Sequence, residues 1–182
     1  TDFAPELLVE AGQLAGPQPK QCQSSDIQAG WHVAKQMGGM DIGQTITIKD
    51  GTVIAVEAIE GTDACIDRTG TLCPRGGWTL VKVSKPQQDM RFDVPTIGPQ
   101  TVRRVADAKG TAIAVEADKT ILVEREETLR LANKLGVSIL SVRDGISLDS
   151  PIPTQSPISS TTDPNHQSPT ENDGDFLPGR AA

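Results

Sequence analysis

Residues 44–58 read QTITIKDGTVIAVEA, two runs rich in Thr, Ile and Val that are separated by Asp50-Gly51. β-rich runs on either side of an Asp-Gly pair are typical of a β-hairpin with a two-residue turn. The sequence therefore predicts one strand over residues 44–49 and a second over residues 52–58.

Outside this hairpin, helical and extended stretches alternate along the chain. Ser25 and Gln28 resemble a capping box that opens a helix, Pro99 suits a first helical position, and Gly110 and Gly136 suit helix ends. This alternation predicts an α/β fold: a mixed sheet that contains hairpins and is covered by helices. The expected elements are helices over 26–37, 63–69, 99–109 and 126–135, and strands over 44–49, 52–58, 78–84, 111–117, 120–124 and 137–142, with 111–124 forming a second hairpin.

The 182 residues are enough for one domain with two irregular ends. Residues 144–182 are rich in Pro, Ser, Thr and Asp and bury too little apolar surface to fold, so we expect a disordered acidic tail. Residues 1–23 are expected to form an irregular linker, because Gly-Pro-Gln-Pro at 16–19 interrupts any helix. The expected domain is then 24–143, and Thr at position 1 fits a piece of a longer protein.

Composition excludes several classes of function. The net charge is −7, and the tail carries six acids and one base, which leaves 18 acids against 16 bases on residues 1–143. A near-neutral body with 3% aromatic residues argues against a nucleic-acid partner. The three cysteines predict neither a disulfide framework nor a zinc site, and they favour a cytoplasmic location.

Three polar segments hold the candidate site: residues 38–44, 57–64 and 82–99, called here the first, second and third polar segments. The first reads GGMDIGQ. Its glycines either end a helix and begin a strand, or let backbone N–H groups approach an anion. Their spacing matches neither a P-loop nor a dinucleotide fingerprint.

The second polar segment reads EAIEGTDA and enters a helix. A helix cap explains Thr62 or Asp63. It does not explain Glu57 and Glu60, because three carboxylates this close repel one another unless a cation joins them. The segment therefore favours a divalent metal or a substrate contact.

The third polar segment reads KVSKPQQDMRFDVPTIGP and follows the carboxyl end of a predicted strand, where α/β sheets bind ligands. Lys85 and Arg91 suit phosphate oxygens. Asp89 and Asp93 suit Mg²⁺ or the orientation of a water nucleophile. The alternative is a surface loop whose charges pair locally.

The catalytic chemistry that these side chains can support is narrow. There is no Gly-x-Ser-x-Gly motif, and the two histidines, His32 and His166, fall in a helix and in the tail, which argues against acyl transfer. Carboxylates together with Lys and Arg favour metal-assisted hydrolysis at phosphorus.

Two strings, MGGMDIGQTITIKDGTVIAVEAIEGTDACI (37–66) and LVKVSKPQQDMRFDVPTIGPQTV (80–102), resemble the carboxyl-terminal half of LpxI-type UDP-2,3-diacylglucosamine pyrophosphatases. GTAIAVEADKTILVEREETLRLANKLGVSIL (110–140) is similar as well, and the resemblance covers about residues 20–142. It implies Mg²⁺-dependent cleavage of UDP-2,3-diacylglucosamine to UMP and 2,3-diacylglucosamine 1-phosphate, an early step in lipid A synthesis.

The resemblance also implies roles for individual residues. Asp93 is the first choice for the acid that activates the metal or water, and Asp89 is the second. The implied metal ligands are Asp93, Asp89 and Glu60, and the implied substrate-binding residues are Gly61, Thr62, Asp63, Lys85, Gln88 and Arg91. An enzymatic role requires Asp63 and Asp93 to share a cavity.

The resemblance implies that an amino-terminal domain precedes the matching region in the family, so that half is an expected partner. A diacylated substrate implies peripheral contact with the inner membrane, and homo-oligomerisation stays open. The alternative function is a non-catalytic module that binds nucleotide sugars or phospholipid precursors.

Overall fold

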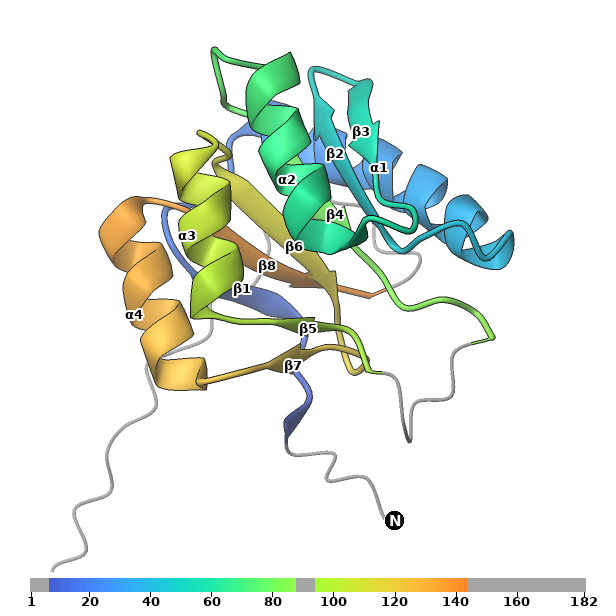
Figure 1. Ribbon diagram of the computed structural model, residues 1–182. Helices are drawn as coiled ribbons and strands as arrows, with labels where there is room; N and C mark the ends of the chain where they lie inside the picture. The colour runs from blue at the N-terminus through green and yellow to red at the C-terminus, as the bar shows by residue number, and fades with distance from the viewer. Residues whose placement is uncertain (1–6, 88–93, 144–182) are drawn as a thin grey trace, which may run out of the picture.

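A computed structural model describes residues 7–87 and 94–143 (Figure 1). Within these ranges the chain forms a six-stranded sheet, a two-stranded sheet and four helices. The elements are β1 (Gly12–Ala15), α1 (Gln21–Gly39), β2 (Thr45–Lys49), β3 (Thr52–Val56), α2 (Gly61–Leu72), β4 (Thr79–Lys82), β5 (Thr96–Ile97), α3 (Pro99–Asp107), β6 (Ala112–Glu116), β7 (Ile121–Leu122), α4 (Arg125–Leu135) and β8 (Ser138–Val142).

The larger sheet is mixed, with the strand order β1-β8-β6-β4-β2-β3. Its central strands β4, β6 and β8 are parallel, whereas β1 is antiparallel to β8, and β2 is antiparallel to both β3 and β4. Asp50 and Gly51 turn the chain between β2 and β3 with φ values of +50° and +75°. The expected first hairpin and the expected fold class are both confirmed.

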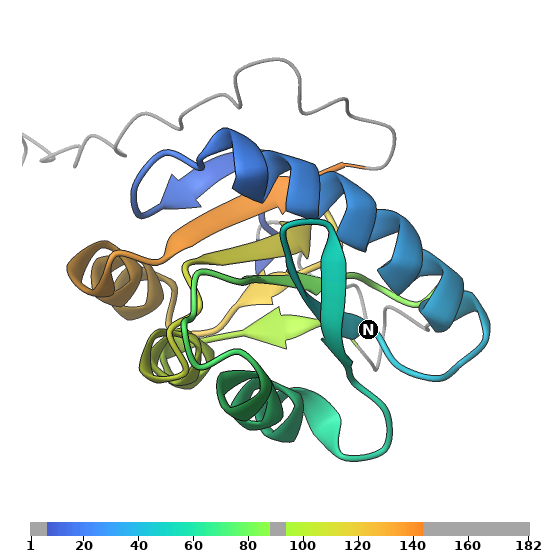
Figure 2. The same ribbon diagram turned by 90° about the horizontal axis from the view of Figure 1, so that it is seen from above.

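Helices cover both faces of this sheet, as Figure 2 shows. α1 packs on one face through Ile27 and Ala34, which lie with Val81 and Ala114 in one apolar cluster. α2, α3 and α4 pack on the other face, and their buried side chains Ile66, Val102, Val105, Leu131 and Ala132 form a second cluster with Trp78, Leu80, Ile113 and Ile139. None of these helices, within the residues that the structure describes, is long and apolar enough to cross a bilayer.

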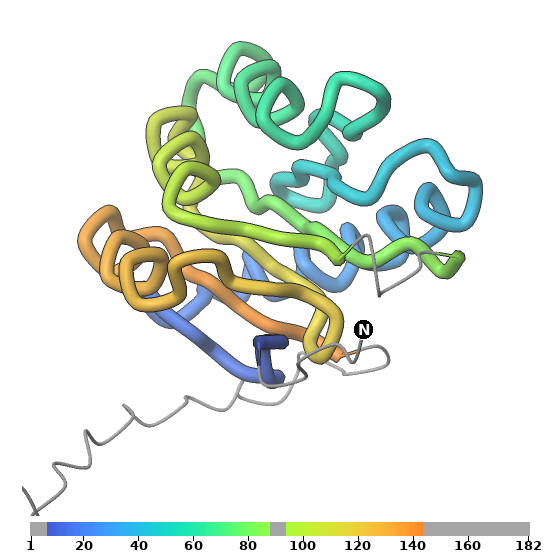
Figure 3. Tube along the Cα trace, turned by 60° about the horizontal axis from the view of Figure 1, so that its bottom comes forward, coloured from blue at the N-terminus to red at the C-terminus, as the bar shows by residue number. Residues whose placement is uncertain are grey.

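The amino-terminal segment differs from the expected irregular chain. Residues 12–15 form the edge strand β1, which runs antiparallel beside β8 (Figure 3). α1 begins at Gln21, five residues before the expected start, because the side chain of Gln23 accepts a hydrogen bond from the backbone N–H of Lys20 at 2.7 Å and caps the helix there. β1 pairs with β8, which lies at the other end of the domain sequence, so the residues around β1 carry no local signal that predicts this strand.

The expected second hairpin, over 111–124, is wrong. β6 has β4 on one side and β8 on the other, so both of its edges are already occupied. β7 pairs instead with β5, in parallel. Asp118 still turns the chain, with a φ of +60°.

α2 is longer than expected at both ends, and Gly70 lies inside it instead of ending it. A Cβ added at Gly70 would lie 3.0 Å from the Cβ of Ala108. The glycine therefore serves the close approach of α2 to the end of α3. The expected helices at Pro99 and before Gly136 are confirmed, with Pro99 in the first turn of α3 and Gly136 capping α4 at a φ of +70°.

Candidate functional site

The three polar segments meet at one end of the six-stranded sheet. The parallel strands β4, β6 and β8 end there. β2 begins there, because Thr45 pairs with Lys82, and β3 ends there, because Val56 pairs with Ile46. We call this end the carboxyl edge, the usual place for a ligand in an α/β sheet.

The first and second polar segments touch through their backbones. A Cβ added at Gly43 would lie 2.0 Å from the carbonyl oxygen of Glu57, so only glycine fits there without a shift of the chain. The backbone N–H of Glu57 also donates to the carbonyl oxygen of Thr45 at 2.8 Å. Gly43 therefore serves close chain packing, and this contact does not support an anion cradle. α1 ends at Gly39 and β2 begins at Thr45, as the alternative of a helix end and a strand start predicts.

The first and third polar segments are joined by an ion pair and by packing. Nζ of Lys85 lies 2.7 Å from Oδ1 of Asp41. This hydrogen bond and the Lys85 charge lower the pKa of the Asp41 carboxyl below its ordinary value. A Cβ at Gly38 would lie 3.5 Å from the Cα of Lys85, and the backbone N–H of Val83 donates to the carbonyl oxygen of Gln44 at 3.0 Å.

Thr62 links the second and third polar segments. Its hydroxyl accepts a hydrogen bond from Nζ of Lys82 at 2.9 Å and donates to Oε1 of Glu57 at 2.9 Å. The Thr45 hydroxyl lies 3.4 Å away. Lys82 and Glu57 are each 8% exposed, so this is a buried polar chain, in which each hydrogen bond is electrostatically stronger than in water.

The second carboxylate oxygen of Glu57, Oε2, is buried and has no hydrogen-bond partner among the described residues. Buried carboxylate oxygens are normally satisfied by a donor or a cation. With the Thr62 and Thr45 hydroxyls it offers the hard oxygen donors that Mg²⁺ prefers. No group of three His, Cys, Asp or Glu side chains within 7–87 and 94–143 is placed to hold a metal ion.

A second buried carboxylate, Glu116, lies at the same edge at the end of β6. It is 2% exposed, and both of its oxygens contact Nζ of Lys35, at 2.6 and 2.7 Å. Oε1 also lies 2.8 Å from Nζ of Lys119, and Oε2 accepts the backbone N–H of Ser84 at 2.8 Å. Glu116 thereby joins α1, the end of β4 and the turn after β6.

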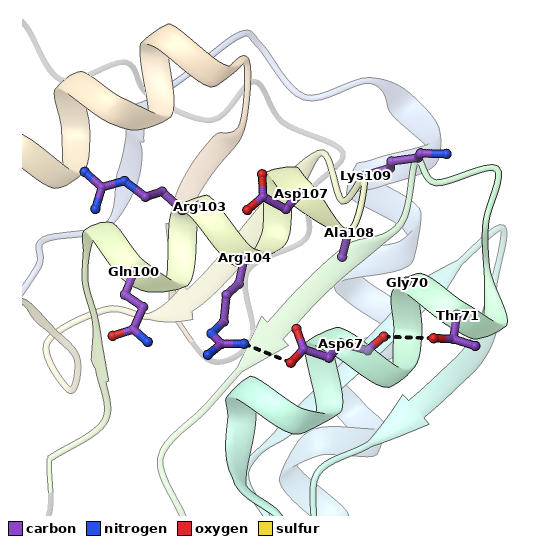
Figure 4. A pocket seen from close by; sticks show the side chains of 9 residues that line it. All are labelled: Asp67, Gly70, Thr71, Gln100, Arg103, Arg104, Asp107, Ala108 and Lys109. Carbon is purple, nitrogen blue, oxygen red and sulfur yellow. Dashed lines mark hydrogen bonds and ion pairs between the residues drawn. The ribbon is translucent and has the colours of Figure 1, made fainter.

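Asp63 makes its contacts with α3, although its sequence neighbour Thr62 contacts Lys82. Its Oδ2 lies 3.1 Å from Nε of Arg104. Arg104 also pairs with Asp67 at 2.8 Å, and these two residues line a pocket between α2 and α3 (Figure 4). Thr62 and Asp63 therefore have separate partners, and the ion pair with Arg104 accounts for Asp63 without a ligand.

Glu60 and Gly61 have structural roles at the start of α2. Glu60 pairs with Arg68, and its other oxygen accepts the backbone N–H of Ala58 at 3.0 Å. Hydrogen bonds from the backbone N–H groups of Glu60 and Ala58, with the Arg68 charge, lower the pKa of Glu60. Gly61 has a φ of +83°, a conformation that favours glycine, and open space surrounds the position of its absent Cβ.

The remaining expected site residues, Gln88, Asp89, Arg91 and Asp93, lie outside the described residues. The expectation that Asp63 and Asp93 share a cavity therefore stays a prediction.

Lys82, Glu116 and Lys35 also belong to the carboxyl edge. None of them is among the expected site residues, although Lys82 is the first residue of the third polar segment. Lys82 ends the buried strand TLVK, and Glu116 ends the buried strand AIAVE. A charged residue that closes an otherwise buried strand is rare without a partner, and this signal could have identified both. Lys35 carries no such signal, because it is one of several polar residues along α1.

Comparisons with known proteins show the family of this chain. A family model described as the LpxI C-terminal domain matches residues 10–140, which include β1 and the described parts of all three polar segments. The UDP-2,3-diacylglucosamine pyrophosphatase LpxI of Caulobacter vibrioides is 37% identical over 144 residues, which are 75% of this chain and 51% of that protein. The chain thus spans about half the length of the curated relative that it matches. Because the family match covers most of the chain and includes the carboxyl edge, this protein belongs to the LpxI C-terminal domain family.

Proposed function

We propose that this chain supplies the carboxyl-terminal half of a Mg²⁺-dependent hydrolase that splits the diphosphate of UDP-2,3-diacylglucosamine. The products are UMP and 2,3-diacylglucosamine 1-phosphate, as in lipid A biosynthesis. The name of the Caulobacter relative supports the substrate and the reaction. The observation that carries the proposal is the hydrogen-bonded chain Lys82–Thr62–Glu57, which joins two of the polar segments at the carboxyl edge.

The lysines of this edge suit a diphosphate. Hydrolysis at phosphorus depends mainly on positioning and on neutralisation of negative charge. Lys82 is held by Thr62, and Lys85 by Asp41, so both ammonium groups are oriented before substrate arrives. We assign them to the diphosphate oxygens, with Arg91 of the same segment as a third cation.

Magnesium completes the proposal. Asp93 is our first choice and Asp89 our second for the carboxylates that hold it, and Glu57 Oε2 is the buried oxygen in the described part that fits a cation. When bound, the ion supplies charge neutralisation and polarises oxygen ligands. Glu60 suits this role less well, because each of its oxygens already has a protein partner.

The proposed setting is the cytoplasm, with peripheral contact to the inner membrane, because a diacylated sugar nucleotide places its acyl chains in a bilayer. The proposed partner is the amino-terminal half that completes the family's longer proteins, since this chain spans 51% of its relative.

The test joins this chain to the amino-terminal half of an LpxI protein and measures UMP release from UDP-2,3-diacylglucosamine with Mg²⁺ and with EDTA. We expect UMP release with Mg²⁺ and none with EDTA. Asp93→Ala should abolish UMP release and leave the melting temperature unchanged. Asp107→Ala, an exposed aspartate at the end of α3, is the matched control and should retain activity.

Each arm of this experiment can fail separately. Full activity in Asp93→Ala would remove the role of that residue, and full activity in EDTA would remove the metal. Substrate binding without turnover in the complete enzyme would instead favour the non-catalytic binding module.

A further inference from the structure

Glu116 has more partners than a carboxylate needs for its burial. It closes β6, a central strand of the sheet, and it is 2% exposed. One lysine within ion-pair distance would offset its charge, but Lys35 and Lys119 both contact it. A third partner, the backbone N–H of Ser84, adds a directed hydrogen bond from a residue of the third polar segment.

Both the backbone N–H and the backbone carbonyl oxygen of Ser84 have a partner. Its N–H donates to Glu116 at 2.8 Å, and its carbonyl oxygen lies 3.5 Å from Nζ of Lys35, which itself pairs with Glu116. Hydrogen bonds to an ionised acceptor are about twice as strong as neutral ones. The next residue is Lys85, so this clamp sits directly where the third polar segment leaves β4.

We propose that Glu116 is a positioning residue, which fixes the start of the third polar segment through Ser84 and thereby sets the placement of Lys85. The kinetic part of this inference rests on the proposed function. The mechanical part, control of Ser84, does not.

The mechanical part is measured first, on this chain, by residue-resolved amide hydrogen exchange. In Glu116→Gln we expect the Ser84 amide to exchange at least about tenfold faster, because the charged acceptor is lost. Lys119→Gln is the matched control. It removes an ion pair of the same carboxylate but leaves the Glu116–Ser84 hydrogen bond, so Ser84 exchange should stay within about twofold of wild type.

The kinetic part uses the chain joined to its amino-terminal half. In Glu116→Gln we expect kcat for UMP release to fall about ten- to hundredfold, with a smaller change in KM, because misplaced reacting groups slow the chemical step. Lys119→Gln should keep kcat within about threefold of wild type.

Unchanged Ser84 exchange in Glu116→Gln overturns the proposal, and so does an equal loss of kcat in both variants, which would mark the cluster as merely structural. If Glu116→Gln does not fold, Glu116→Asp keeps the charge on a shorter arm and should still speed Ser84 exchange at least about threefold; no change would overturn the proposal. If the wild-type enzyme releases no UMP, the proposed function fails, and Ser84 exchange alone decides the role of Glu116.

Discussion

The hydroxyl of Thr62, in the first turn of α2, receives a hydrogen bond from Nζ of Lys82, at the end of β4, with the two atoms 2.9 Å apart. The same hydroxyl donates to Oε1 of Glu57. A threonine hydroxyl has one proton and two lone pairs, so it can serve as donor and acceptor at once. Thr62 therefore orders a lysine and a glutamate that are both buried at the carboxyl edge.

We expect Thr62→Val to break the hydrogen bonds that join Lys82, Thr62 and Glu57, because valine has the shape of threonine but no hydroxyl. The variant leaves the buried groups of Glu57 and Lys82 without their shared partner, which should lower the free energy of unfolding by about 1–3 kcal/mol. UMP release by the complete enzyme should fall at least about tenfold in kcat/KM, because Lys82 loses its orientation. Urea denaturation and steady-state kinetics check the two effects.

Thr62→Ser keeps the hydroxyl and is the matched control, with expected stability and kcat/KM close to wild type. A valine variant as active as the serine variant would show that the hydroxyl plays no part in the reaction.

A second prediction concerns Gly43, where an added Cβ would lie 2.0 Å from the carbonyl oxygen of Glu57. The atoms nearest to this position all belong to the backbone of Glu57 and Ala58, so no side chain can move aside. Gly43→Ala must therefore separate the first and second polar segments. We expect a loss of about 1–3 kcal/mol in the free energy of unfolding, typical of overpacking. Urea titration of the two proteins measures it.

Gly39→Ala provides the contrast within the same segment. Gly39 lies in the last turn of α1, and apart from its chain neighbours and the adjacent backbone of α1 no atom lies within 4 Å of the position of its absent Cβ. Alanine there should be neutral or stabilising, by up to about 1 kcal/mol. Equal losses in both variants would mean that the contact with Glu57 does not decide the choice of glycine at Gly43.

Local signals predicted much of the fold. The Asp50-Gly51 turn, Pro99 at the start of α3 and Gly136 at the end of α4 each act through backbone conformation within a few residues. The sequence did not predict β1, and it paired β7 with the wrong strand. The partners of these strands, β8 for β1 and β5 for β7, depend on which sheet edges remain open. That choice depends on the whole topology and is absent from any short stretch of sequence.

The site divides in the same way. The third polar segment alone indicates Lys85, whereas the role of Thr62 is implied by the family resemblance, and the structure brings their segments together. Asp63 was selected for its carboxylate, but the side chain of Arg104 on another helix is its partner, and no spacing along the chain reveals that. The position of Glu116 at the end of a buried strand indicates that it needs a partner, but the sequence does not reveal that its partners lie on three separate elements.

The ion pair between Asp41 and Lys85 predicts a pH-dependent stability. The hydrogen bond and charge of Lys85 lower the pKa of Asp41 in the folded state. A lowered folded pKa means that the ionised form favours folding, so the stabilisation is present above the unfolded pKa of about 3.9 and is lost as pH falls through the folded value.

We therefore expect wild type to have a higher melting temperature than Asp41→Asn at pH 7, with the difference disappearing in acid. Because Asp41 is 81% exposed, 1 M salt at pH 7 should also shrink the difference. Thermal denaturation from neutral pH into acid measures this. A difference that is equally large in acid would rule out the ion pair as its source.

Thiol reactivity gives a prediction that does not depend on the proposed function. Cys22 is exposed, whereas Cys65 is buried, and burial raises the pKa of the Cys65 thiol to about 11. The thiolate is the reactive form, so Cys65 should be inert to a chromogenic disulfide reagent at pH 8, where Cys22 reacts at once. Adding denaturant should make the Cys65 thiol reactive. Cys22→Ser should remove the rapid reaction of Cys22 and leave Cys65 unreactive in the native protein. Rapid reaction of Cys65 in the native protein would mean that α2 opens from the sheet far more readily than its packing against β2, β3 and α3 allows. The position of Thr62 at the start of that helix would then be open to the same motion.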